Sequence, residues 1–134
     1  MIAVDTNVLV RLIVADDAGQ GKRAAKLFAQ SAEVFVVKTV VLETAWVLQS
    51  AYGFSRHDVA GALRRLAGLP NVVLEDAEQV AFALDLTSRD VDFADALHVA
   101  ACREAGTFYT FDRRLIRHGD GLGITVTEPE EIGT

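Results

Sequence analysis

The chain has 134 residues and a formal net charge of −6, with 51% hydrophobic and 24% charged residues. This composition is typical of a folded globular protein and excludes a disordered chain, while the length predicts one domain over residues 1–134. The acidic balance disfavours a nucleic-acid partner, because phosphates are bound by Lys and Arg, unless cations neutralise a local cluster of acids.

Short apolar runs alternate with amphipathic segments along the chain. In chain order, the pattern predicts strands at residues 2–4, 34–37, 72–74, 107–111 and 124–126. It predicts helices after the first strand, around 24–31, from Thr39 to Tyr52, from Ser55 through Leu66, from Asp76 through Thr87, from Asp92 to Gly106, and over 113–119. Thr39, Ser55 and Asp76 are predicted to cap the helices that they begin, and Gly53 is predicted to end the helix before it.

These strands are short and almost entirely apolar, which is typical of a parallel sheet covered by helices. The alternation predicts an α/β three-layer sandwich, with a mostly parallel central sheet of four to five strands flanked by helices. Ligands of such sheets bind outside the carboxyl ends of the strands. Residues directly after the strands are therefore the first candidates for a site.

Two acids follow predicted strands: Asp5 after residues 2–4 and Asp112 after residues 107–111. Either acid has an alternative role as the N-cap of the helix that follows it. Asp95 likewise has the alternative of serving the first turn of a helix capped by Asp92. No acid decides the question by itself.

Glu43 lies in the segment TVVLETAWVL, whose neighbours leave little room for a polar face. We therefore expect a helix that is buried nearly all round. A buried charge costs several kcal/mol unless it is paired or bound to a cation. The alternative is that Glu43 reaches solvent or an arginine.

A βαβ chain can bring Asp5, Glu43, Asp95 and Asp112 to one edge of the sheet. Carboxylates about 4 Å apart repel one another by roughly 4 kcal/mol at an effective dielectric of 20, so such a cluster requires cations. Oxygen ligands suit Mg²⁺ or Mn²⁺. A zinc site on His98 and Cys102 is a weaker alternative, because no second ligand pair accompanies them, and Cys102 is expected to be a small buried residue.

Cys102 is the single cysteine of the sequence, so no internal disulfide forms. The apolar start is interrupted at Asp5, unlike a signal peptide, and no run reaches the ~20 apolar residues that span a bilayer. We expect a cytoplasmic protein with no membrane partner.

The segments DTNVLVRL, VVLETAWVL, DFADALHVAA and TFDRRL follow one another in this order. With these motifs, the chain resembles PIN-domain ribonucleases over essentially its whole length, and in particular the VapC-type toxins of toxin–antitoxin pairs. The resemblance implies a PIN-like fold and a hydrolase that cleaves RNA with Mg²⁺ or Mn²⁺. It assigns catalysis and metal binding to Asp5, Glu43, Asp95 and Asp112.

Further residues stand beside these acids in the sequence. Thr6, Asn7, Asp92 and Thr110 are candidates to orient a carboxylate or a metal-bound water, and Asp92 is also expected to cap its helix. Candidate RNA-binding residues are basic and flank the acids: Arg11, Arg113, Arg114 and Arg117. Each of these arginines has the alternative of a solvated helix face.

The resemblance also implies partners. It implies a structured RNA substrate such as tRNA or ribosomal RNA, a homodimer, and a cognate VapB-type antitoxin that blocks the site. Trp46 on the third helix, and Leu63 and Leu66 on the fourth, are candidate contact surfaces or else core. The RNA target, the cleavage motif and the number of metal ions are not determined by the sequence.

Two other classes of α/β protein fit the sequence less well. A phosphoacceptor signalling domain also clusters acids at strand ends, but it needs a second acid beside Asp5 and a lysine after a late strand, and no lysine follows Lys38. A dehalogenase-type phosphatase needs an Asp where Asn7 stands. A catalytically silent PIN-like interaction module remains an alternative.

Overall fold

A computed structural model describes residues 1–130 of the chain. The elements are β1 (Ile2–Ala3), α1 (Thr6–Ile13), α2 (Ala18–Gln30), β2 (Val34–Val36), α3 (Lys38–Tyr52), α4 (Arg56–Ala67), β3 (Val72–Leu74), α5 (Ala77–Ser88), α6 (Phe93–Ala101), the short 3₁₀ helix η1 (Arg103–Ala105), β4 (Thr107–Tyr109), α7 (Arg113–Arg117) and β5 (Thr125–Thr127). No helix within these residues is long and apolar enough to span a membrane.

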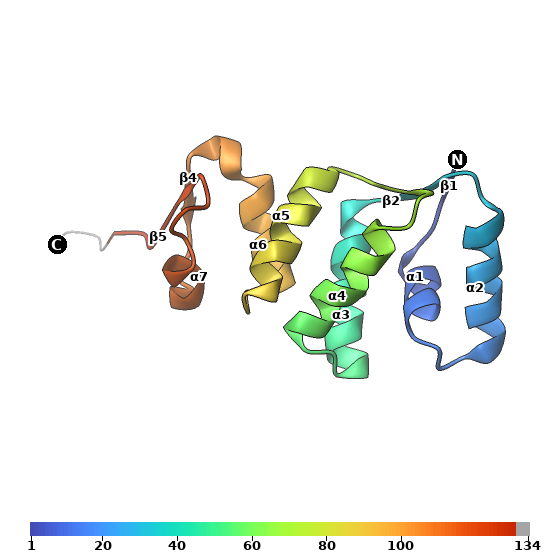
Figure 1. Cartoon of the computed structure of the whole chain (residues 1–134). Coiled ribbons are helices and arrows are strands. Elements are labelled where there is room, and N and C mark those ends of the chain that lie inside the picture. Colours follow the sequence, from blue (N-terminus) through green and yellow to red (C-terminus); the bar gives the residue numbers. More distant parts are fainter. Residues whose placement is uncertain (131–134) are drawn as a thin grey trace.

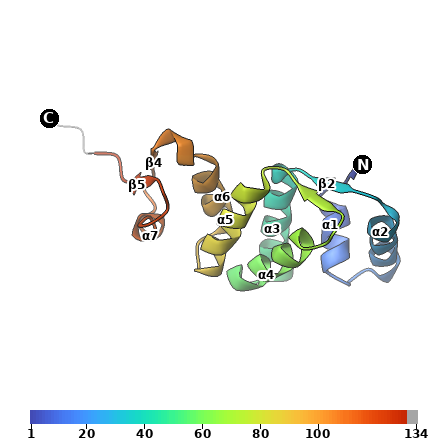
Figure 2. The same ribbon diagram turned by 45° about the horizontal axis from the view of Figure 1, so that its top comes forward.

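Within residues 1–130 the strands form two separate parallel sheets, one of three strands in the order β1-β2-β3 and one of two strands, β4-β5. The prediction of parallel pairing is confirmed. The prediction of four to five strands in one central sheet is not met in the single chain, because β4 pairs with β5 and with no strand of the first sheet. Figures 1 and 2 show β4, α7 and β5 together at one end of the molecule, with helices between them and β1.

The hydrophobic core lies against one face of the three-stranded sheet. Val34 and Val36 of β2 point into it and are fully buried. The other face carries Ala3, Phe35 and Val73 in register, of which Ala3 and Val73 are exposed and Phe35 is partly exposed. Helices therefore cover one face, and the predicted three-layer sandwich is not complete within one chain.

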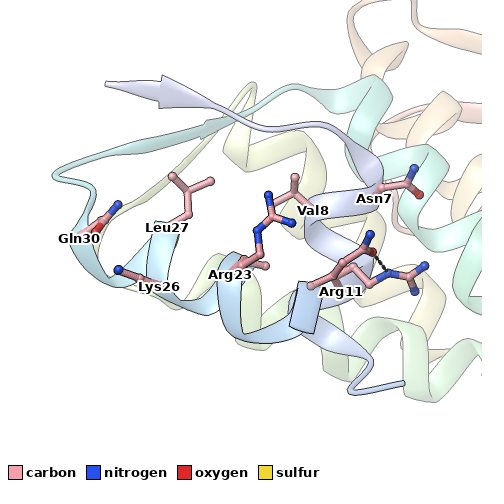
Figure 3. A pocket seen from close by; sticks show the side chains of 9 residues that line it. Asn7, Val8, Arg11, Arg23, Lys26, Leu27 and Gln30 are labelled. Atoms are coloured by element: carbon pink, nitrogen blue, oxygen red, sulfur yellow. Dashed lines mark hydrogen bonds between the residues drawn. The ribbon is translucent and has the colours of Figure 1, made fainter. Parts of the chain in front are cut away.

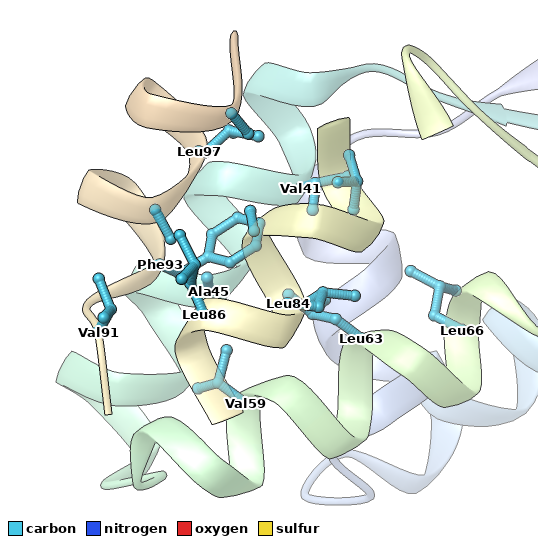
Figure 4. Packing of buried hydrophobic residues seen from close by; sticks show 14 of the residues in the cluster. Val41, Ala45, Val59, Leu63, Leu66, Leu84, Leu86, Val91, Phe93 and Leu97 are labelled. Atoms are coloured by element: carbon cyan, nitrogen blue, oxygen red, sulfur yellow. The ribbon is translucent and has the colours of Figure 1, made fainter. Parts of the chain in front are cut away.

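Most of the core is formed by helices packed on helices. α5 packs against α4 and α6, and Phe93 of α6 is buried beside side chains of α3, α4 and α5 (Figure 4). Leu63 and Leu66 of α4 are buried as well, so they are core residues and do not form an exposed contact surface.

Several predicted helix ends are confirmed. The Ser55 side chain accepts a hydrogen bond from the Asp58 N–H at 3.0 Å and caps α4. Gly53 ends α3 in the left-handed conformation, with a φ of 68°. α2 begins at Ala18, earlier than predicted, because Asp17 caps it through the Gln20 N–H.

Two predicted caps are wrong. α3 begins at Lys38, before Thr39, and the Lys38 N–H donates to the Glu75 carboxylate at 2.7 Å. Asp76 lies at the start of α5 but forms no side-chain cap, since its carboxylate pairs with the Lys38 ammonium at 2.8 Å. In both cases side chains distant in the sequence supply the partner.

Leu48 and Trp46 provide a matched test of this packing, because both are large apolar residues of α3 with exposed fractions of 0% and 66%. Leu48→Ala is expected to lower the free energy of unfolding by about 3 kcal/mol, because it leaves a cavity in the core. Trp46→Ala is expected to change it by less than about 0.5 kcal/mol. Urea denaturation measures both, and equal effects would contradict the assigned burial.

Candidate acidic site

Asp5 and Glu43 lie together where β1 leads into α1. Asp5 is the N-cap of α1, and its carboxylate accepts a hydrogen bond from the Val8 N–H at 3.4 Å. The buried Thr6 donates its hydroxyl hydrogen to the Glu43 carboxylate. Asp5 thus caps α1 as the alternative role predicted. The same hydrogen bond holds its exposed carboxylate one residue from Thr6, which binds Glu43.

Glu43 itself is exposed, contrary to the expectation of a helix buried nearly all round. α3 buries one stripe, which consists of Val41, Thr44, Ala45 and Leu48. Glu43 and Trp46 lie on the opposite, exposed side. Apolar composition predicted burial here, but no segment of residues 1–130 covers that side of the helix.

The other acids gather where α6 begins. Asp92 caps α6 through the Ala94 N–H at 3.2 Å, as predicted, and Asp112 caps α7 through the Arg114 and Leu115 N–H groups at 2.9 and 3.3 Å. Asp92, Asp95 and Asp112 line one small cavity of about 20 Å³, together with Arg56, Val91, Arg114 and Leu115. A space of this size holds about one water or one small ion.

Asp95 is the acid of this group whose charge is least favourable. Its partial burial raises the pKa of its carboxyl above the ordinary value, the charges of Asp92 and Asp112 raise it further, and His98 and Arg56 lower it. Within residues 1–130 no hydrogen bond reaches the Asp95 carboxylate, whereas Asp92 and Asp112 are each held by backbone N–H groups. Burial and the two neighbouring acids thus make the charged form of Asp95 less favourable than in water, a cost that a nearby cation would offset.

The structure does not bring the four predicted metal ligands together. Across the described part of the chain, no group of three acidic, histidine or cysteine side chains is placed to hold a metal ion. Glu43 is bonded to Thr6, the residue after Asp5, whereas Asp95 and Asp112 line the small cavity at the start of α6. Carboxylate oxygens are suitable ligands for Mg²⁺ or Mn²⁺, but a single chain in this conformation does not fit a four-carboxylate centre.

A groove between α1 and α2 begins next to the first pair of acids. It encloses about 500 Å³ and is lined by Asn7, Val8, Arg11, Gln20, Arg23, Ala24, Lys26, Leu27 and Gln30 (Figure 3). Its basic residues come from both helices, and Asn7 stands at the acidic end. The sequence did not point to Arg23 and Lys26, because no motif lies beside them. Their position next to α1 results from tertiary packing.

Arg11 is partly committed to structure. Its guanidinium donates to the Gln20 side chain at 2.6 Å and to the Tyr52 hydroxyl at 3.0 Å, and it pairs with Asp16 at 3.0 Å. The bond to Tyr52 raises the pKa of Arg11, and the Tyr52 hydroxyl that donates to Asp16 lowers the pKa of that carboxyl. Arg11 therefore connects α1, the next loop and the end of α3, in addition to lining the groove.

The remaining candidates are distributed over the second half of the chain. Arg113, Arg114 and Arg117 are exposed on α7, and they form no ion pair within residues 1–130. The Thr110 hydroxyl accepts the Asp112 N–H at 3.0 Å and shapes the turn before α7. Arg56, which sequence reasoning missed, reaches the acids from the start of α4 and also pairs with Asp90 at 3.3 Å.

The zinc alternative receives no support from the geometry. His98 and Cys102 are both exposed, which corrects the expectation that Cys102 is buried. Cys102 follows the last residue of α6, so helical periodicity extrapolated past Ala101 placed it wrongly.

Comparison with known proteins identifies a family. The family model of the PIN domain matches residues 2–121. No curated protein matches the chain in a direct sequence comparison. Among solved structures, the chain is similar to the crystal structure of VapC20 of Mycobacterium tuberculosis, described as a toxin that cleaves the sarcin–ricin loop, with 26% identity, a TM-score of 0.45, and coverage of 89% of this chain and 95% of that chain.

The pKa of Asp95 predicts a pH effect on the metal-free protein. The pKa of Asp95 lies above its ordinary value of 3.8. The contribution of Asp95 to the free energy of unfolding is therefore most favourable below pH 3.8, and it falls as the pH rises through the raised pKa. Asp95→Asn is expected to remove this dependence and to raise the free energy of unfolding at pH 7 by on the order of 0.5 kcal/mol. The effect is small because solvent screens a partly exposed group.

Denaturation of wild type and Asp95→Asn between pH 4 and 7 measures this difference. Glu33→Gln, which removes an exposed carboxylate outside the cluster, is the control and is expected to follow the wild-type profile. Identical profiles for wild type and Asp95→Asn would contradict the assigned environment.

Proposed function

The chain belongs to the PIN-domain family, and from this premise we propose that it is a metal-dependent endoribonuclease of the VapC type, the toxin of a type II toxin–antitoxin pair. The proposal is carried by one observation. The family match spans residues 2–121 and contains all four acids that the motifs single out. The nearby basic groove and the arginines of α7 supply positive charge that an RNA backbone requires.

The proposed roles follow from how each acid is held. Asp5, Glu43, Asp95 and Asp112 are the catalytic and metal-binding acids. Neighbouring groups position them: Thr6 fixes Glu43 by a hydrogen bond, and Thr110 shapes the turn that carries Asp112. The Thr6 contact restricts the rotation of the Glu43 carboxylate, and the N–H groups of Arg114 and Leu115 restrict that of Asp112, which lowers the entropic cost of assembling a site.

Mg²⁺ or Mn²⁺ is the proposed cofactor, because the four side chains offer carboxylate oxygens. The proposed reaction is hydrolysis: the oxygen of water bonds to phosphorus, the bond from phosphorus to the 3′ oxygen breaks, and the products carry a 5′ phosphate and a 3′ hydroxyl. The proposed partners are a structured RNA, such as tRNA or ribosomal RNA, a cognate VapB-type antitoxin, and a second copy of the chain.

Cleavage of a panel of labelled RNAs by the purified protein tests the activity. We expect cleavage with Mn²⁺ or Mg²⁺, none with EDTA, and at least a 100-fold loss in Asp5→Asn and Asp112→Asn, since each removes a proposed ligand. Asp85→Asn is the matched control, because Asp85 is exposed on α5 and pairs with Arg89. Undiminished cleavage by Asp5→Asn would reject the assignment.

The groove between α1 and α2 gives a second prediction. The double variant Arg23→Ala with Lys26→Ala is expected to weaken RNA binding at low salt. It is also expected to lower the slope of log affinity against log salt concentration by about 0.7 for each lost phosphate contact. Lys22→Ala is the control, because Lys22 is an exposed residue of α2 that does not line the groove. Equal slopes for the double variant and wild type would show that RNA binds elsewhere.

A further inference from the structure

Two strands of the structure each have an edge without a partner. Within residues 1–130, β1 pairs with β2 on one side and β4 pairs with β5 on one side, and both pairings are parallel. The other edge of each strand exposes backbone N–H and C=O groups, which is a template for pairing with another strand. A two-stranded sheet such as β4-β5 has little stability by itself.

The open edges of β1 and β4 lack the features that protect a true outer strand. Pro70 lies two residues before the outer strand β3, and Glu128 and Pro129 directly follow the outer strand β5. Prolines and charges at such positions discourage further pairing. In contrast, residues 1–4 and 106–111 around β1 and β4 contain neither a proline nor a charged side chain. The sequence therefore suits β1 and β4 to the inside of a larger sheet.

Large apolar side chains are also uncovered at these two strands. Met1, just before β1, is exposed by 73%; Tyr109, the last residue of β4, and Phe111, two residues after it, are exposed by 62% and 74%. Two exposed aromatic residues at an unpaired strand are typical of an interaction surface.

The acids are divided in the same way as the sheet. Asp5 and Glu43 lie at the carboxyl end of β1, and Asp95 and Asp112 lie beside the end of β4. If β4 paired with β1 in parallel, both carboxyl ends would meet at one edge, with neighbouring strands about 4.8 Å apart. All four acids would then face a common space.

We propose that β4 of one copy pairs in parallel with β1 of a second copy, and that each catalytic site contains Asp5 and Glu43 of one chain with Asp95 and Asp112 of the other. The reciprocal contact gives a closed two-fold dimer with two sites and a five-stranded sheet, β3-β2-β1-β4-β5, in each half. This proposal rests on the proposed nuclease function for the role of the site.

A second copy satisfies both edges with each chain in the conformation seen here. In Figures 1 and 2 the β4-α7-β5 unit lies at the end of the molecule away from β1, with α3 to α6 between them. Pairing β4 with β1 of the same chain would require the β4-α7-β5 unit to move past α6, and α6 is held in the core by the buried Phe93 and Val99. The link between α6 and β4 is short, residues 102–106, and short links favour exchange between copies.

Mixed dimers of inactive variants test the composite site. Asp5→Asn and Asp112→Asn chains are co-expressed with different affinity tags and purified through both tags. One site of the mixed dimer then contains both substitutions, and the other contains neither. We expect about half of the wild-type activity, one intact site of two, although each variant by itself is inactive.

Matched pairs set the controls. Asp5→Asn mixed with Glu43→Gln, and Asp95→Asn mixed with Asp112→Asn, are expected to stay inactive, since each pair damages the same half of every site. Wild-type activity with no recovery in the Asp5→Asn and Asp112→Asn mixture would overturn the proposal and leave the proposed function intact.

Cross-linking gives a readout independent of activity. In a Cys102→Ser background, chains with Ala3→Cys are mixed with chains with Tyr109→Cys and treated with a short bis-maleimide; we expect a covalent dimer. Light scattering should give twice the 14.5 kDa chain mass, reduced to the monomer by Tyr109→Lys and unchanged by Trp46→Lys. A wild-type monomer, or a dimer broken by Trp46→Lys and not by Tyr109→Lys, would overturn the proposal. If the wild-type chain cleaves no RNA, the proposed function fails, and cross-linking decides the strand pairing.

Discussion

The unpaired backbone edge of β1 is the constraint on which the arrangement depends. A parallel sheet is stable when its strands are paired and its faces are covered. Within residues 1–130, however, β1 has a partner on one side only, and no helix covers the face that bears Ala3, Phe35 and Val73. The strands that match this edge in direction and apolar character are present in the same chain but lie at its far end. The second copy proposed above supplies a partner for this edge with each chain in the same conformation.

Three of the acids in these two places are compensated by the backbone. Asp5, Asp92 and Asp112 cap helices, so backbone N–H groups compensate their charges even without a cation. Within residues 1–130 Asp95 accepts no such hydrogen bond, and its pKa is raised first by partial burial and then by the charges of Asp92 and Asp112. A carboxylate that caps a helix keeps an oxygen that can bind a metal ion. The two roles that the sequence suggests for these acids therefore do not exclude each other.

Local features of the fold were predictable from the sequence, whereas long-range arrangement was not. The Ser55 cap and the Gly53 helix end depend on groups a few residues apart, and both are confirmed. The exposure of Glu43 and of Cys102, and the division of the sheet, depend on which segments cover others. Apolar composition indicates that a surface will be covered but does not say by which part of the chain, or by which copy. The motifs made the four acids candidates for one site, and their separation into two places became visible only in the structure.

The most direct measurement is a crystal structure of the protein grown with MnCl₂, with anomalous scattering used to locate the manganese. The composite arrangement predicts an anomalous peak between Asp5 and Glu43 of one chain and Asp95 and Asp112 of its partner, with β1 and β4 of different chains side by side. A peak enclosed by all four acids of a single chain, with β4 paired to β1 of the same chain, would contradict it.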